Sequence, residues 1–177
     1  MADESNYWNK RAYKYSQRPI SDEAAYEKKL EITRSYFRPD MDVLEIGCGT
    51  GSTALAHAPY VKHILATDFS AKMIEIAREK AQAAGIDNVT FEALPVDELG
   101  VADGGVDAVM AHSLLHLLED REQTIADVHR MLNPGGVFVT STACLGDMMP
   151  LFRLVLPIGR FLRLFPLVKV FQAAELK

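Results

Sequence analysis

The stretch Val43-Leu44-Glu45-Ile46-Gly47-Cys48-Gly49-Thr50-Gly51 decides the fold. It begins as a short, mostly apolar run that predicts a buried strand, and it ends in glycines at every second position. Glycine adopts a positive φ without strain and leaves space for a ligand against the backbone. We therefore expect a ligand-binding loop, followed by a helix from about Ser52 to Ala58. A tight turn that binds nothing is the simpler alternative.

Strand-like and helix-like segments alternate on both sides of this loop. Apolar and β-branched runs predict strands at 43–46, 63–67, 89–91, 106–110 and 137–140. Helices are expected between them, with Ser70 and Asp120 as N-caps and Gly85 as a terminator, and another helix is expected at 21–37. This order predicts an α/β fold, Rossmann-like and doubly wound, with a mainly parallel sheet and helices on both faces.

Composition narrows the class of protein. A length of 177 residues fits a single domain, 1–177, and a net charge of −5 argues against a nucleic-acid partner. The two cysteines, Cys48 and Cys144, are expected as reduced thiols, and no Cys and His pairing suggests a metal site. Because residues 1–6 are polar and acidic, they do not form a secretory signal, and a cytoplasmic protein is expected.

Asp68 indicates which ligand the loop holds. It follows Gly47 by 21 residues, at the end of the second predicted strand, where a carboxylate can accept both hydroxyls of a ribose. Capping of the helix after Ser70 is the alternative. The loop lacks the Lys-Ser/Thr ending of a P-loop, and Ser52 replaces the last glycine of a dinucleotide fingerprint. No tyrosine precedes a lysine by four residues, which further disfavours a hydride-transferring enzyme.

Together with Thr67-Asp68-Phe69-Ser70 and Leu132-Asn133-Pro134-Gly135-Gly136, the glycine stretch resembles the class I methyltransferases. The branch is the one that includes ubiquinone- and menaquinone-biosynthesis methyltransferases and many small-molecule enzymes, and the resemblance covers roughly residues 7–142. It implies S-adenosylmethionine as cofactor, S-adenosylhomocysteine as product and a small-molecule acceptor. An NAD(P)-linked oxidoreductase and an S-adenosylmethionine-binding protein without catalysis are the alternatives.

The resemblance also implies the cofactor contacts. Glu45 and the glycine loop would hold the methionyl part, Asp68 the ribose, and Phe69 and Met73 would lie near the adenine, although Met73 equally suits a helix core. Pro95 stands where many relatives carry an Asp, so adenine contacts would fall to the backbone of 94–96 or to Asp97. An aromatic lid at 7–15 would cover the sulfonium, unless that helix packs on the sheet edge instead. The implied cofactor-binding residues are Tyr15, Glu45, Gly47, Cys48, Gly49, Gly51, Asp68, Phe69, Met73, Leu94, Pro95, Val96 and Ala111.

His112 and His116 follow the fourth predicted strand and are the candidate catalytic residues. A hydroxyl or phenol acceptor needs a general base, whereas an amine or carbanion-like acceptor does not. The remaining histidines, His57, His63 and His129, are expected in surface-like positions with structural roles.

The segment 148–171 is the strongest sequence clue to the acceptor. It is apolar and basic, with no acidic residue, and charges interrupt it well before the roughly 18 apolar residues of a membrane span. It predicts an interfacial segment in peripheral contact with a membrane, or a lid over a lipophilic acceptor. An insertion packed on its own domain or on a dimer partner is the alternative. The expected organisation is a helical lid at 1–40, a cofactor-binding core at 41–143 and this lid or interfacial segment at 144–177.

The resemblance also implies a closing antiparallel hairpin, for which only 35 residues remain after Thr142. We expect that hairpin to be missing through truncation or loss, and a homodimer to cover the open edge of the sheet.

Overall fold

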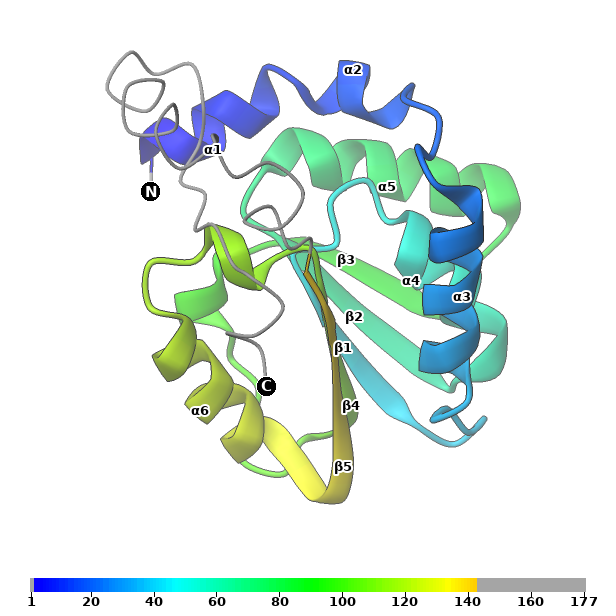
Figure 1. Ribbon diagram of the computed structural model, residues 1–177, viewed down its shortest axis with the longest axis vertical. Coiled ribbons are helices and arrows are strands. Elements are labelled where there is room, and N and C mark those ends of the chain that lie inside the picture. The colour runs from blue at the N-terminus through cyan, green and yellow to red at the C-terminus, as the bar shows by residue number, and fades with distance from the viewer. Residues whose placement is uncertain (1, 143–177) are drawn as a thin grey trace.

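Five parallel strands form the sheet that the alternating pattern predicts (Figure 1). The computed structural model describes residues 2–142. The strands are β1 (Asp42–Ile46), β2 (His63–Asp68), β3 (Val89–Ala93), β4 (Val106–His112) and β5 (Leu132–Ser141). The α-helices are α1 (Ala2–Asn9), α2 (Ala12–Ser16), α3 (Glu23–Arg34), α4 (Ser52–His57), α5 (Ala71–Ala84) and α6 (Arg121–Met131), and the 3₁₀ turns are η1 (Ala58–Tyr60), η2 (Val96–Glu98) and η3 (Leu115–Leu117).

The strand order is β3-β2-β1-β4-β5, so β1 and β4 are neighbours although two strands separate them in the chain. Glu45 pairs with Met110 across this junction. The order in which successive strands join the sheet reverses here, although all the strands are parallel. This reversal makes the carboxyl ends of β1 and β4 the topological switch point where open α/β sheets bind ligands. The sheet therefore places the glycine loop beside the residues that follow β4.

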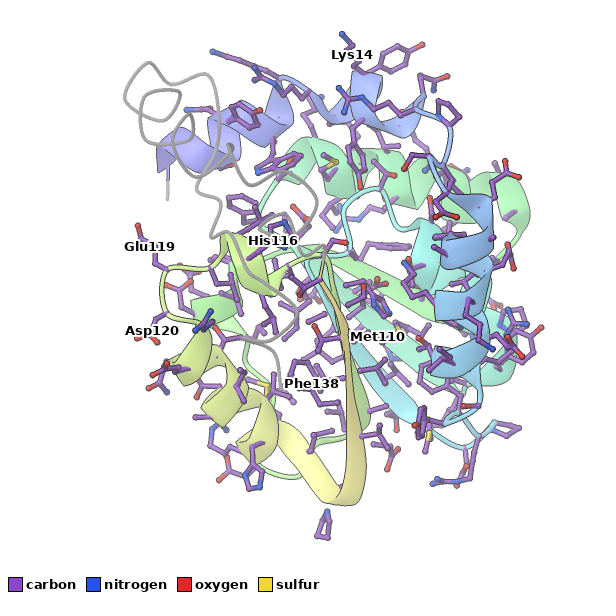
Figure 2. The ribbon with its side chains drawn as sticks, viewed as in Figure 1. Lys14, Met110, His116, Glu119, Asp120 and Phe138 are labelled. Carbon is purple, nitrogen blue, oxygen red and sulfur yellow. The ribbon has the colours of Figure 1, made fainter. Side chains whose placement is uncertain are left out.

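Helices cover both faces of the sheet, as predicted. Because side chains alternate along a strand, Val43 and Met110 face the α4 and α5 side, whereas Leu44 and Val109 face the α6 side. Figure 2 shows Met110 and Phe138 on these opposite sides. The two buried clusters fix the sheet in place between its helical layers.

The helix starts follow the predicted caps. The side chains of Ser70 and Asp120 accept hydrogen bonds from the backbone N–H groups three residues ahead, and Gly85 ends α5 in the left-handed conformation. The helix expected at 21–37 is shorter, because α3 ends at Arg34 and the chain continues in turns. Strand β5 begins earlier than expected, at Leu132, because a register shift between Val106 and Ala108 accommodates the Asn-Pro-Gly-Gly segment within it.

The N-terminal helices α1 and α2 run across the end of the sheet where the strands terminate, next to α5 (Figure 1). The residues of the predicted lid, 7–15, fall in this region. The predictions for 144–177, the closing hairpin, membrane contact and the homodimer lie outside the described residues. Within residues 2–142, none of the helices has the length and apolar character needed to span a bilayer, and no cluster of His, Cys, Asp and Glu could hold a metal ion.

Candidate cofactor-binding site

Three glycines shape the loop after β1, and all have positive φ: +69° at Gly47, +54° at Gly49 and +75° at Gly51. A Cβ at Gly51 would lie 2.7 Å from the Phe91 ring, and one at Gly47 would lie 2.7 Å from Leu114. These two glycines are needed because the protein packs against them. Gly49 differs, since the nearest described atom to its Cβ position belongs to Tyr15, 3.8 Å away. The loop is therefore open at Gly49.

Asp68 ends β2 directly beside this opening. Its carboxylate accepts hydrogen bonds from the Gly49 N–H (3.0 Å) and the Ser70 N–H (2.8 Å). Burial raises the pKa of Asp68, and the two N–H donors oppose that effect. Each carboxylate oxygen can accept more than one hydrogen bond, so the group retains acceptor capacity for a ligand. Asp68 thus joins the glycine loop to the start of α5, while Ser70 supplies the helix cap.

The residues predicted near an adenine lie beyond Asp68. Asp68 pairs with Ala93 at the end of β3, which brings Leu94, Pro95 and Val96 to the same edge of the sheet. These three side chains are half-buried, as is Phe69. Met73 is only 3% exposed, which favours the helix-core alternative for its side chain.

The aromatic lid reaches the glycine loop through Tyr15. The ring lies over Gly49 and contacts Trp8 edge to face, with 6.2 Å between ring centroids. Burial and then the negative charge of Asp68 raise the pKa of the Tyr15 hydroxyl, so the ring remains neutral. The predicted lid residue is therefore held above the loop and close to Asp68.

Glu45 is buried beneath the loop. It is 2% exposed, and its Oε2 has no hydrogen-bond partner among residues 2–142. Burial raises the pKa of Glu45 to about 8, against the opposing charge of Lys29. Lys29 belongs to α3, and its Nζ donates a hydrogen bond to Thr53 Oγ1 in α4 at 3.4 Å. Among residues 2–142, none forms an ion pair with the Glu45 carboxyl group.

We expect Glu45→Gln to change how stability depends on pH. A raised pKa means that the folded protein binds this proton more tightly, so wild-type stability falls as the pH rises from about 4.5 to about 8. The variant lacks that loss. Relative to wild type it should gain on the order of 2–4 kcal/mol in free energy of unfolding between pH 5 and pH 9, since one pKa unit corresponds to about 1.4 kcal/mol. Urea unfolding at both pH values measures the difference.

The matched control is Glu31→Gln on the exposed side of α3. Lys28 lowers the pKa of Glu31, so this carboxylate stays ionised throughout that pH range. Equal pH profiles for Glu45→Gln and wild type would contradict a buried, easily protonated Glu45.

The two candidate catalytic histidines occupy different surroundings. His112 ends β4 on the same side as Met110 and is 9% exposed, and its Nδ1 lies 3.1 Å from Ser141 Oγ. Burial lowers the pKa of His112 to about 3. His116 lies in η3, beside the ends of the strands (Figure 2). It is half-buried, and burial lowers its pKa as well. Both rings are therefore neutral near pH 7.

The surface position expected for His57 is wrong. The residue is 0% exposed, its ring packs edge to face on Phe37 at 5.1 Å, and burial lowers its pKa to about 4. The reason is that α4 buries Ala54 and His57 together, and its six residues show too little periodicity to indicate this buried side from the sequence.

Several contacts that shape the site were not foreseen from the sequence. Leu114 closes the loop below Gly47, and the preceding Ser113 has a φ of +53° and donates from its N–H to the Ser141 carbonyl at 2.7 Å. Lys80 Nζ donates to Thr50 Oγ1 at 2.9 Å and so ties α5 to the loop. These contacts join segments distant in sequence, and no local pattern indicates them.

The arrangement fits S-adenosylmethionine in three ways. Gly49 leaves one side of the loop open, and Asp68 offers acceptor oxygens beside it. Glu45, in the strand that leads into the loop, has a carboxyl oxygen with no hydrogen-bond partner in the described part of the chain. The loop and Glu45 are at the switch point between β1 and β4, and Asp68 ends the neighbouring strand β2 at the same edge of the sheet.

Known proteins are similar to this chain in sequence and in fold. A family model described as a methyltransferase domain matches residues 43–136. The methyltransferase YcgJ of Bacillus subtilis is 33% identical over 110 residues, which cover 62% of this chain and 44% of that protein. The ubiquinone/menaquinone biosynthesis C-methyltransferase UbiE of Desulfotalea psychrophila is 32% identical over 121 residues, covering 67% of this chain and 46% of the relative. The chain thus spans less than half the length of these two curated relatives.

Solved structures also have a similar fold. The crystal structure of YcgJ superposes with a TM-score of 0.72 at 26% identity, over 85% of this chain and 64% of that one. A complex of DhpI with SAH superposes with a TM-score of 0.65 at 30% identity, over 80% of this chain and 69% of DhpI. The family model covers more than half of the chain and includes both the glycine loop and Asp68. The chain therefore belongs to the class I S-adenosylmethionine-dependent methyltransferases.

Proposed function

We propose that this chain transfers a methyl group from S-adenosylmethionine to a small acceptor at the carboxyl edge of β1 and β4. The observation that carries the proposal is the hydrogen bond from the Gly49 N–H to Asp68. It joins the open glycine loop at the switch point to the carboxylate that we expect to bind the ribose.

In this proposal each predicted residue has one task. The backbone at Gly47, Cys48, Gly49 and Gly51, with Glu45 beneath it and Ala111 at the end of β4, holds the methionyl part. Asp68 accepts the ribose hydroxyls. Phe69 and the segment 94–96 contact the adenine, Met73 supports them from the helix core, and Tyr15 covers the open side of the loop. Their support is their common position at one edge of the sheet.

When bound, S-adenosylmethionine supplies an electrophilic methyl group on a sulfonium sulfur. The chain contributes alignment, because holding the acceptor in line and close to that methyl removes much of the entropic barrier. The lid helices contribute by excluding water above Gly49. Neither task requires a charged side chain at the reacting atoms.

The acceptor is proposed to be lipophilic. The support is the apolar, basic sequence 148–171, which lies outside the described residues. Formation of S-adenosylhomocysteine should be measured with quinols, phospholipid amines and phenols as acceptors. Turnover that depends on a lipophilic acceptor is the expected result. Tight binding of S-adenosylmethionine without turnover on any acceptor would favour a binding protein instead.

A hydroxyl or phenol acceptor leads to a prediction about the two histidines. His116→Gln should lower kcat by about 100-fold, the usual scale of a lost general base, whereas His112→Gln should lower it by about tenfold or less. The reason is that a pKa near 3 makes His112 a weak base at neutral pH. His129→Gln on the exposed side of α6 is the control. Unchanged kcat in both variants would mean that the acceptor needs neither histidine as a base.

A further inference from the structure

The side chain of Asn9 forms hydrogen bonds that connect the N-terminal helices to the start of α5. Its Oδ1 accepts a hydrogen bond from Ser70 Oγ at 2.7 Å and another from the Lys72 N–H at 3.2 Å. Asn9 is the last residue of α1, and these donors belong to the first turn of α5. The bonds therefore connect the lid to the helix that begins directly after Asp68.

Ser70 passes this connection to the cofactor site. Its N–H donates to Asp68 Oδ1 at 2.8 Å, and its Oγ also accepts from the Met73 N–H at 3.3 Å. The Ser70 side chain thus caps α5 and binds Asn9, while its backbone orients Asp68. A substitution at Asn9 would therefore affect the Asp68 carboxylate through a single residue, Ser70.

The side-chain nitrogen of Asn9 also helps to hold α1 against the residues that precede α5. Asn9 Nδ2 donates to Ser5 Oγ at 3.2 Å, and Ser5 Oγ donates to the Phe69 carbonyl at 3.4 Å. Six residues further on, Tyr15 lies over Gly49. With eight and five residues, α1 and α2 are too short to be stable alone, so their position depends on such contacts.

We propose that Asn9 is a positioning residue that sets the affinity for S-adenosylmethionine, and this inference rests on the proposed function. By holding α1 against the start of α5, Asn9 keeps Tyr15 above the glycine loop and keeps Ser70 and Asp68 oriented. When the lid is docked only part of the time, the apparent affinity falls by that fraction.

Titration of S-adenosylmethionine into three variants tests the proposal. Asn9→Ala removes the acceptor and should raise Kd about tenfold, the scale expected for two lost hydrogen bonds. Asn9→Asp keeps an acceptor for Ser70 and Lys72 and should stay within about threefold of wild type, because a carboxylate is also favourable at a helix N-terminus. Asn6→Ala, on an exposed position of the same helix, is the matched control and should bind like wild type.

Amide hydrogen exchange over residues 2–16 gives a second readout. Asn9→Ala should exchange faster there, with protection of β1 and β4 unchanged, which separates loss of the attachment from general unfolding. Equal Kd for Asn9→Ala and wild type would overturn the proposal, and so would equal losses in Asn9→Ala and Asn9→Asp. Absence of binding by the wild type would instead refute the proposed function, while the exchange data would still report on the attachment.

Discussion

Replacing Asp68 with alanine is expected to raise the Kd for S-adenosylmethionine about 1,000-fold. Two charge-assisted hydrogen bonds to ribose hydroxyls would be lost, each about 1.5–3 kcal/mol, and tenfold in Kd corresponds to about 1.4 kcal/mol. The substitution also leaves the Gly49 and Ser70 N–H groups without their carboxylate acceptor. The loss therefore combines a missing ligand contact with a loop that no longer has its partner. Isothermal titration calorimetry measures it.

Two variants bracket this expectation. Asp68→Asn keeps one acceptor oxygen and should bind more weakly than wild type but more tightly than Asp68→Ala. Asp87→Ala changes an exposed Asp in the turn after α5 and should leave the affinity unchanged. An affinity of Asp68→Ala within about threefold of wild type, well below one lost charge-assisted bond, would show that Asp68 serves only the fold.

Gly51→Ala is expected to destabilise the protein by about 2–5 kcal/mol. Non-glycine residues at a φ of +75° are strained by about 1–2 kcal/mol, and overpacking adds about 1–3 kcal/mol. The added methyl would lie 2.7 Å from the Phe91 ring and 2.8 Å from Ala77 Cβ, where α4 begins against β3 and α5. Urea unfolding followed by circular dichroism gives the change in free energy of unfolding.

Gly85→Ala separates the two contributions. Gly85 has a similar φ of +65°, but a Cβ there would meet nothing within 4 Å. This variant should therefore cost only about 1 kcal/mol, from backbone strain. Equal losses in the two variants would mean that packing around Gly51 contributes little and that the loop can adjust.

The fold follows closely from local sequence patterns. The apolar runs at β1, β2 and β4 predict strands, and caps such as Ser70 and terminators such as Gly85 predict where a helix between them begins and ends. The two kinds of local signal therefore indicate the same elements. The parallel order also follows, since helices separate the strands. Element ends were less predictable, because the start of β5 depends on a register shift that only the neighbouring strand determines.

The candidate site was predictable in part. The structure brings the glycine loop, Asp68 and Tyr15 together at one edge of the sheet, and their roles towards a cofactor stay predictions. The contacts of Leu114 with Gly47 and of Asn9 with Ser70 were not predictable, since these partners are more than 60 residues away and the residue types carry no signal by themselves. His57 was misplaced because a six-residue helix shows too little periodicity to reveal its buried side.

We propose above all that S-adenosylmethionine binds to Asp68 and to the loop from Glu45 to Gly51. The most direct measurement is calorimetric titration of the chain with S-adenosylmethionine, S-adenosylhomocysteine and NAD. We predict saturable, one-to-one binding of both adenosyl ligands, lost in Asp68→Ala, and no binding of NAD. Binding of NAD without either adenosyl ligand would contradict the claim.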